Sequence, residues 1–209
     1  MNRSAVAFAS IFFATAVCTA GEFNPTLSIN DKAPAWKELP GTDGKKHSLA
    51  TIKKKAIVVV FTCNSCPYAV DYEDRLVALA EKYKKKDVQI IAINVNKVPE
   101  DSLDEMKKRA RAKGFHFPYL FDETQKIARD FGTTYTPEFF VLNKDRKVVY
   151  MGAMDDSTDP KKVKHQYVQS AIDGVLSDKP IEKKETVAIG CRVRYERVRR
   201  TRRRSSKPK

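Results

Sequence analysis

The chain has 209 residues, a formal net charge of +14 and four cysteines. The length suits one ordinary domain with extensions, and a hydrophobic content of 42% is enough for a real core. Four cysteines are too few for a scaffold that depends on a framework of disulfides. The positive charge is concentrated in residues 192–209, which carry ten Arg or Lys and one Glu, a net charge of +9.

The first twenty residues have the pattern of an export signal. Arg3 provides a short positive region, residues 5–17 are apolar, and small residues precede Gly21. We expect residues 1–20 to be a signal peptide cleaved after Ala20, which predicts an exported protein, periplasmic or secreted. The alternative is an uncleaved membrane anchor, although the apolar stretch is short for a membrane span. Export would place the chain in an oxidising compartment.

Hydrophobic patterns predict alternating strands and helices along the chain. Continuous β-branched runs indicate buried strands, and apolar stripes at helical spacing indicate helices packed on them. In chain order we expect a β-hairpin at 36–39 and 45–49, a strand at 56–62, a helix at 67–84, a strand at 87–95, a helix capped by Asp101 or Ser102 that runs to Lys113 and is ended by Gly114, a short helix capped by Thr124 and ending near Gly132, a β-hairpin at 138–142 and 147–151, and a helix from Pro160 to about Leu176.

This order of elements predicts an α/β fold. The early strand–helix–strand units predict parallel strands with right-handed crossovers, and the late hairpin adds antiparallel strands. We therefore expect a mixed central β-sheet flanked by helices, with the first hairpin as an N-terminal extension.

The feature with the most chemical content is the sequence Cys63-Asn64-Ser65-Cys66, between a predicted strand and a predicted helix. At a helix N-terminus, free N–H groups and the helix dipole favour a thiolate. We expect Cys63 to occupy that position, and Cys66 to be close enough to form a disulfide with it. Strand, CxxC and helix in this order favour a redox pair.

A structural disulfide and a metal site are the alternatives for these two cysteines. A disulfide across two residues closes almost no loop and so constrains the unfolded chain little. A closed zinc site needs four ligands, and the histidines at 47, 116 and 165 have no spacing typical of ligands. A copper- or zinc-handling module remains the alternative from another functional class, although we assign no metal ligands.

With Thr136-Pro137 about seventy residues after the CxxC, the sequence resembles the thioredoxin superfamily over residues 30–191. It is most similar to exported peroxiredoxin-like redoxins, related to AhpC/TSA proteins, that carry CxxC, and to TlpA/ResA-type thiol-disulfide proteins. The segments that carry the resemblance are 60–68, 122–125, 136–140, 150–153 and 188–191.

The resemblance implies a thioredoxin-like fold and the activity of a thiol-disulfide oxidoreductase. Cys63 would be the nucleophile and Cys66 the resolving thiol. Pro137 would follow a cis peptide bond beside the sulfurs and present the backbone of Thr136 to an extended substrate. The cysteines would be the redox group without an organic cofactor, and protein thiols or disulfides and a separate redox donor would be the partners.

Two departures from the family patterns bear on the activity. Thr62 stands where thioredoxins have Trp before the first cysteine. If Cys66 is aligned with the peroxiredoxin cysteine, Val59 and Cys63 stand where that family has Pro and Thr. A peroxiredoxin-like thiol peroxidase is therefore an alternative that the sequence disfavours.

Several other residues are candidates for the site. Glu138 is either an acid that relays protons near the thiols or an exposed carboxylate at a strand end. Thr62 could hydrogen-bond near Cys63. Asn94 and Asn96 end a predicted strand, near the edge where ligands bind in open α/β sheets, although turn formation is the favoured explanation. Cys191 is a candidate third redox thiol, with a dimer-forming thiol and a buried structural residue as the alternatives.

These observations divide the chain into a signal peptide at 1–20, a thioredoxin-like domain at 21–191 and a basic tail at 192–209. Blocks of like charge usually stay disordered, and we expect this of the tail. Contact with an anionic surface is the alternative, whereas export argues against a nucleic-acid partner.

Overall fold

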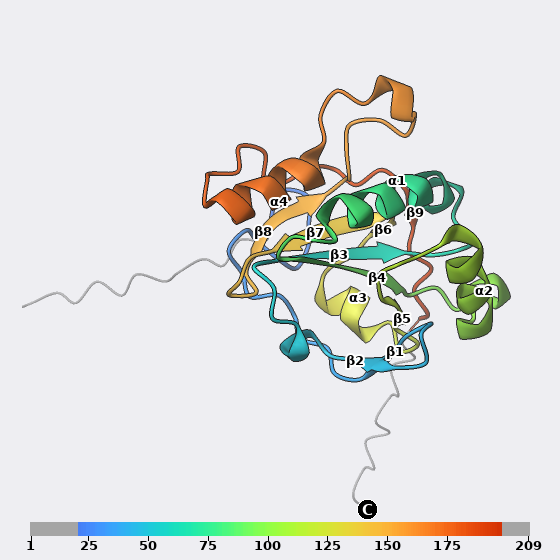
Figure 1. The fold of residues 1–209 in the computed structure, drawn as a ribbon. Coiled ribbons are helices and arrows are strands. Elements are labelled where there is room, and N and C mark those ends of the chain that lie inside the picture. Colours follow the sequence, from blue (N-terminus) through green and yellow to red (C-terminus); the bar gives the residue numbers. More distant parts are fainter. Residues whose placement is uncertain (1–20, 198–209) are drawn as a thin grey trace, which may run out of the picture.

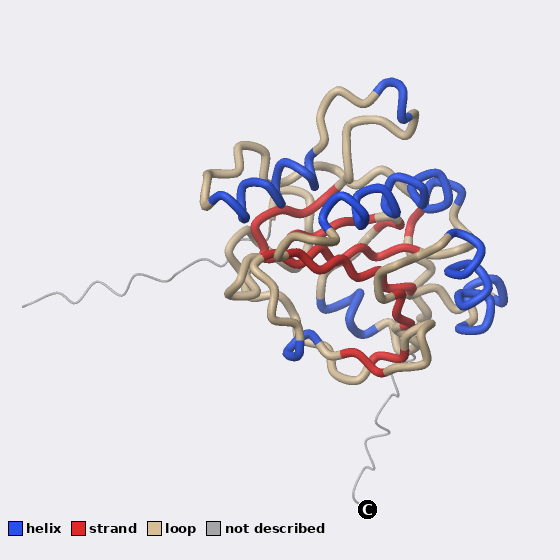
Figure 2. The backbone as a smooth tube through the Cα atoms, viewed as in Figure 1, coloured by secondary structure: helices blue, strands red, loops and turns tan. Residues whose placement is uncertain are grey.

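The computed structural model describes residues 21–197, which form a five-stranded sheet with helices on both faces (Figures 1 and 2). The strand order is β5-β4-β3-β7-β8. Strands β3, β4 and β5 are parallel, while β7 pairs antiparallel with β3 and β8 antiparallel with β7. The predicted mixed sheet is confirmed. The strands are β3 (Ala56–Thr62), β4 (Val88–Asn94), β5 (Tyr119–Phe121), β7 (Glu138–Leu142) and β8 (Val148–Gly152).

Helices and two short strand pairs complete the described part of the chain. The α-helices are α1 (Pro67–Tyr83), α2 (Leu103–Lys113), α3 (Lys126–Asp130) and α4 (Tyr167–Ser177). The 3-10 helices are η1 (Leu49–Thr51), η2 (Pro99–Asp101) and η3 (Pro160–Lys162). The short antiparallel pairs are β1 (Leu39–Pro40) with β2 (Lys46–His47), and β6 (Tyr135–Thr136) with β9 (Cys191–Arg192).

Strand β3 lies in the middle of the sheet and all seven of its residues are buried. Side chains alternate between the two faces of a strand. Val58 and Val60 therefore pack into one apolar cluster, whereas Ile57, Val59 and Phe61 pack into the other. Because both faces of the sheet are covered, the sequence of this strand is continuously apolar and does not alternate between apolar and polar residues.

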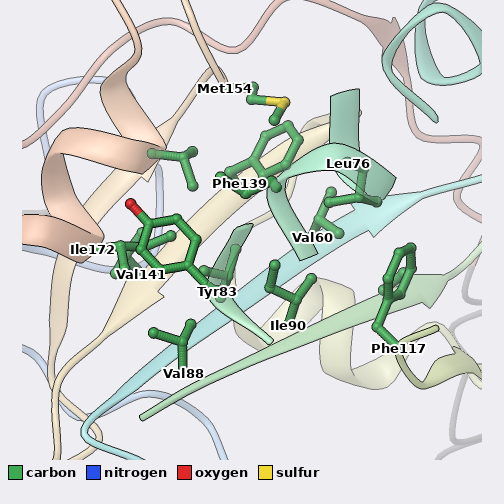
Figure 3. Packing of buried hydrophobic residues seen from close by; sticks show 14 of the residues in the cluster. Val60, Leu76, Tyr83, Val88, Ile90, Phe117, Phe139, Val141, Met154 and Ile172 are labelled. Atoms are coloured by element: carbon green, nitrogen blue, oxygen red, sulfur yellow. The ribbon is translucent and has the colours of Figure 1, made fainter. Parts of the chain in front are cut away.

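Helices α1 and α4 lie together on one face of the sheet (Figure 1). Figure 3 shows Leu76 and Tyr83 of α1 and Ile172 of α4 over Val60 and Val141 of the strands. The opposite face is covered by α3 and by the N-terminal segment, including the buried Trp36. This packing holds the carboxyl end of β3 in place, where the CxxC follows.

The boundaries of α2 follow the predicted signals closely. Ser102 is the N-cap, and its hydroxyl accepts a hydrogen bond from the N–H of Glu105 at 3.4 Å. Gly114 ends the helix at φ 63°, a left-handed conformation that glycine adopts at little cost. The predicted C-terminal stop is confirmed.

The last helix begins later than predicted. Asp159 caps only the short η3, with its carboxylate accepting from the N–H of Lys161 at 3.0 Å. The chain then extends and α4 starts at Tyr167. Residues 160–166 include three lysines, and buried apolar side chains that pack on the sheet resume only with Val168. Burial of an amphipathic face supplies most of a helix's stability, so the pattern at Pro160 was insufficient.

Three smaller predictions also need correction. Gln125, not Thr124, is the N-cap of the short α3, although the Thr124 hydroxyl accepts from the N–H of Lys126 at 3.2 Å. The N-terminal hairpin forms but has only two residues in each strand. Strand β5, which is only three residues long, was not predicted.

The predicted end of the domain at Cys191 is too early. Arg192 lies in β9, Val193 is buried, and the Tyr195 hydroxyl donates to the carbonyl of Thr133 at 2.7 Å. Apolar and aromatic side chains between the basic residues supply these contacts, so residues 192–197 are packed on the domain rather than disordered. The predicted signal peptide and the tail beyond residue 197 lie outside the described residues. Within residues 21–197, no helix is long and apolar enough to cross a membrane.

Candidate redox site

The CxxC sequence spans the gap between the end of β3 at Thr62 and the start of α1 at Pro67. Cys66, rather than Cys63, is the N-cap residue of α1. The two thiols are free and buried, with 2% of Cys63 and 3% of Cys66 exposed. The expectation that the first sulfur occupies the helix N-terminus is wrong, because the helix begins one residue after the second.

Thr136 joins the distant Thr-Pro motif to both sulfurs. The Thr136–Pro137 peptide bond is cis, as the resemblance implied. The Thr136 hydroxyl lies 3.4 Å from the Cys63 Sγ, and the Thr136 carbonyl accepts a hydrogen bond from the Cys66 thiol at 3.1 Å. The structure therefore brings together the residues that the sequence placed at one site.

The interaction between the two thiols moves their pKa values in opposite directions. The pKa of Cys66 is lowered to about 4, mainly by the hydrogen bond with Cys63 and further by the thiol of Cys191 and the N–H groups of Ala69 and Cys191. The pKa of Cys63 is raised by its hydrogen bond with Cys66 and by burial.

The Thr136 carbonyl opposes ionisation of Cys66 because it accepts from the protonated thiol. The thiols of Cys63 and Cys191 and the neighbouring N–H groups nevertheless lower the pKa of Cys66, because donors to the charged form favour it. The directions of the two shifts favour Cys66 as the site of the negative charge in the reduced pair. Cys63 borders a small internal void of about 10 Å³ with Tyr72 and Tyr119, so it faces the interior.

A buried carboxylate holds the turn between the two cysteines. Asp101, at the end of η2, is fully buried and accepts from the N–H of Asn64 and from the hydroxyl of Ser65, each at 2.5 Å. It also accepts from the Asn94 side-chain amide at 2.9 Å. Its negative charge contributes to the raised pKa of Cys63. Asp101 is thus a positioning residue for the redox pair.

Sequence reasoning missed this role because Asp101 resembles an ordinary helix cap. Asn94 and Asn96 had been interpreted as turn residues, but both are buried and bound to the site. Asn94 donates to Asp101, and Asn96 donates to the Ser65 hydroxyl at 3.4 Å. Their place after a buried parallel strand was the available signal, because such strand ends converge at one edge of a sheet.

Tyr119 completes this polar network from β5. Its hydroxyl donates to the side-chain oxygen of Asn64 at 3.0 Å and lies 3.2 Å from the Asn94 amide nitrogen. Burial raises the pKa of Tyr119 well above its ordinary value. The hydroxyl therefore acts as a neutral donor that fixes the CxxC turn.

Glu138 supports the loop before Pro137. It is buried, not exposed, and one carboxylate oxygen accepts from the N–H of Thr134 at 2.8 Å and from that of Tyr135 at 3.0 Å. Burial raises the pKa of Glu138 to about 7, against the effect of these two bonds. Among the described residues, no hydrogen bond joins Glu138 to a thiol, so its contacts indicate positioning of the Thr136 loop.

The remaining candidates differ in their distance from the thiols. Thr62 pairs with Asn94 at the strand ends, and within the described chain it makes no hydrogen bond to either sulfur. Cys191 packs directly against the cluster of Cys63 and Cys66 and is partly exposed. The pKa of Cys191 is raised to about 11, first by burial and then by its hydrogen bond with Cys66.

In the part of the chain that the structure describes, no three His, Cys, Asp or Glu side chains form a group that could hold a metal ion. His47 instead contacts the carboxylate of Asp43 at 3.1 Å. The residues around the sulfurs are donors and acceptors that orient a dithiol.

A mixed sheet, a CxxC between β3 and α1, and a cis-proline loop touching both sulfurs define a redox protein with a thioredoxin-like fold. The model of the AhpC/TSA family matches residues 29–151, more than half of the chain. The chain belongs to the AhpC/TSA family, and it is an oxidoreductase, a redoxin of the thioredoxin superfamily.

Curated relatives and solved structures agree with this assignment. The thiol-disulfide oxidoreductase ResA of Bacillus thuringiensis is 32% identical over 127 residues, which cover 59% of this chain and 68% of ResA. An uncharacterized conserved protein from Geobacillus kaustophilus has a TM-score of 0.78 at 35% identity, covering 83% of this chain and 95% of that one. A putative thiol:disulfide interchange protein DsbE from Chlorobium tepidum has a TM-score of 0.60 at 21% identity, covering 72% and 99%, and shares the fold.

Proposed function

We propose that this chain is a thiol-disulfide oxidoreductase in which Cys63 and Cys66 alternate between dithiol and disulfide. The observation that carries the proposal is the contact of both sulfurs with Thr136, beside a lowered pKa at Cys66. A reactive dithiol next to a backbone that can pair with an extended peptide suits protein thiols and disulfides as substrates. The relative named thiol-disulfide oxidoreductase supports the same activity.

Within the pair, we assign the first attack to Cys66, whereas the sequence pattern had placed it on Cys63. The Cys66 thiolate attacks one sulfur of a substrate disulfide, and the other substrate sulfur leaves as a thiolate. Once Cys66 is in the mixed disulfide, it no longer carries the charge that helps to raise the pKa of Cys63. Cys63 then loses its proton and attacks Cys66, which releases the second substrate thiolate and leaves the pair oxidised.

Trapping of mixed disulfides tests the activity and the order of attack. In a chain that also carries Cys191→Ser, we expect the Cys63→Ser variant to accumulate a mixed disulfide at Cys66 with a disulfide-linked peptide, because no neighbouring thiol remains to displace the peptide. The Cys66→Ser variant in the same background should accumulate much less, and both are read by mass spectrometry after alkylation. Accumulation only in Cys66→Ser would return the attack to Cys63. Absence of mixed disulfides in both variants, together with no Cys63–Cys66 disulfide in the wild type, would overturn the proposed function.

The direction of electron flow follows from the reduction potential of the couple. A stabilised thiolate favours the reduced form and so makes the disulfide more oxidising. The lowered pKa of Cys66 therefore predicts a potential above the value of about −270 mV for thioredoxin. Equilibration with glutathione buffers measures it, and a potential below that of thioredoxin would contradict the assigned charge on Cys66.

We place this activity outside the cytosol because residues 1–20 have the pattern of a signal peptide. N-terminal sequencing of the exported protein should find Gly21 first, and an intact Met1 on a membrane-bound chain would favour the uncleaved anchor instead. Peroxidase chemistry is not proposed, since the aligned Val59 and Cys63 lack the groups that the family pattern provides.

A further inference from the structure

A C-terminal segment of this chain, residues 190–196, covers the redox site. Its β9 pairs antiparallel with β6 (Figure 1). The register of this pair places Cys191 directly opposite Thr136. The N–H of Val193 donates to the carbonyl of Thr134 at 2.9 Å. The chain itself therefore occupies the backbone edge at which an extended substrate peptide would pair with the Thr136 loop.

The fit between this segment and the loop is close at the backbone level. A Cβ atom built on Gly190 would lie only 2.2 Å from the carbonyl oxygen of Thr136. Glycine at this position lets the two backbones approach. Any larger residue would push the segment, and with it Cys191, away from the site.

Further contacts fasten the segment after Cys191. The Gln125 side chain donates to the carbonyl of Arg194 at 3.0 Å and accepts from the N–H of Glu196 at 2.8 Å. The N–H of Arg194 donates to the side chain of Asn96 at 3.3 Å. Asn96 also contacts Ser65 between the two cysteines, so the covering segment and the redox pair share a support.

Cys191 is the residue of this segment that meets the redox pair. It packs against Cys63, Cys66 and Ala69, and its thiol and N–H group help to lower the pKa of Cys66. Cys191 is partly exposed, while 2% of Cys63 and 3% of Cys66 are exposed. The third sulfur thus lies between the buried pair and solvent, in the place that a substrate cysteine would occupy.

We propose that Cys191 is a third redox cysteine that exchanges with Cys66 and transfers the oxidation state between the buried pair and external thiols. This proposal rests on the proposed function of the pair. It extends that function by making the C-terminal segment an internal substrate of the site. External dithiols then react first at Cys191, the sulfur nearest to solvent.

The exchange balances without any further oxidant. Starting from the Cys63–Cys66 disulfide, the Cys191 thiolate attacks the Cys66 sulfur, a Cys66–Cys191 bond forms, and Cys63 leaves as a thiolate and takes up a proton. One thiolate of an external dithiol then attacks Cys191 and releases Cys66. The second external thiol closes its own disulfide and releases Cys191, so the external dithiol is oxidised and the chain is reduced.

The Cys63→Ser variant tests the predicted bond directly. After mild oxidation of the full chain with glutathione disulfide, we expect a Cys66–Cys191 disulfide in this variant, read by peptide mass spectrometry under non-reducing conditions. The matched Cys66→Ser variant should form much less of a Cys63–Cys191 bond, because Cys63 faces the interior. Absence of the Cys66–Cys191 bond would overturn the proposal, whether or not the wild type forms the Cys63–Cys66 disulfide.

The rate at which the Cys63–Cys66 disulfide is reduced distinguishes a redox role of Cys191 from a segment that only covers the site. In Cys191→Ser, the Cys63–Cys66 disulfide should still form, but its reduction by dithiothreitol should slow by about tenfold or more because the exposed sulfur is gone. Gly190→Ala should slow it in the same direction by displacing Cys191, whereas Val187→Ala, at an exposed position nearby, should leave it unchanged. Reduction of Cys191→Ser at the wild-type rate or faster would show that the segment only blocks the site.

Discussion

The two ends of β3 lie in different physical environments. Most of the strand, including Val58 and Val60, lies between two apolar clusters in which each side chain has many equivalent neighbours. Its carboxyl end at Thr62 leads into a hydrogen-bonded cluster, the polar corner, in which Asn64, Ser65 and Asn94 all donate to the carboxylate of Asp101. The apolar part sets the stability of the fold by summed burial. The polar corner sets the position and charge of two sulfurs through a few directional contacts.

The largest effect on stability is expected in the apolar part. Phe140 is fully buried, and its ring lies 5.1 Å from that of Phe131 and 5.8 Å from that of Phe61. Phe140→Ala should reduce the free energy of unfolding by about 3–5 kcal/mol, from lost burial and a cavity. Urea unfolding measures this loss. The reduction potential of the cysteine pair should stay at the wild-type value, and a clear shift would show that the apolar cluster around Phe140 and the polar corner are coupled.

A substitution in the polar corner should change the properties of the cysteine pair, unlike the substitution of Phe140. Asp101→Ala leaves three donors from Asn64, Ser65 and Asn94 without their acceptor, which should cost about 2–3 kcal/mol. The pKa of Cys63 should also fall, because the charge of Asp101 helps to raise it. Alkylation rates as a function of pH report this change.

The Asp101→Asn variant is the matched control for that substitution. It removes the charge but keeps an oxygen acceptor, so the pKa of Cys63 should fall while most of the stability remains. If both variants lost the same stability and left the pKa of Cys63 unchanged, the electrostatic role assigned to Asp101 would be wrong.

An effect of similar size, seen only as a change with pH, is expected at Glu138. Burial raises its pKa from 4.5 to about 7 in the folded chain, so the folded state favours the protonated form. Its contribution to stability is full below pH 4.5 and is lost as the pH rises through 7. The loss amounts to about 3 kcal/mol.

Glu138→Gln keeps an acceptor for the N–H groups of Thr134 and Tyr135 but does not titrate. We therefore expect the wild type to lose stability relative to this variant between pH 5 and pH 8, measured by urea unfolding at both values. A constant difference between the two proteins over this range would mean that Glu138 is ionised throughout.

Particular residues show how far sequence patterns reached. Three predicted features depend only on residues close in the sequence, and the structure has them where they were predicted. They are the apolar run of β3, the Ser102 cap and the Gly114 stop. The start of α4 was misplaced because the contact of Val168 with the sheet, rather than the local signal at Pro160, determines where that helix begins.

The site divides in the same way. The cysteine pair and the Thr136-Pro137 motif could be found from the sequence because their residue types and spacing are distinctive. Asp101 and Tyr119 could not be assigned to the site, because nothing in their local sequence says which distant segment they will contact. The charge on Cys66 also depends on a sulfur 125 positions along the chain and so had no local signal.

The sequence by itself determined the mixed α/β architecture, the presence of a redox dithiol and its combination with a distant proline, because hydrophobic periodicity and reactive residue types are local properties. The tertiary structure decided which carboxylate holds the turn, and that the segment ending in Glu196 covers the site. These depend on distances between residues far apart in the chain. Burial strengthens these contacts, because hydrogen bonds and charges interact more strongly where water is excluded.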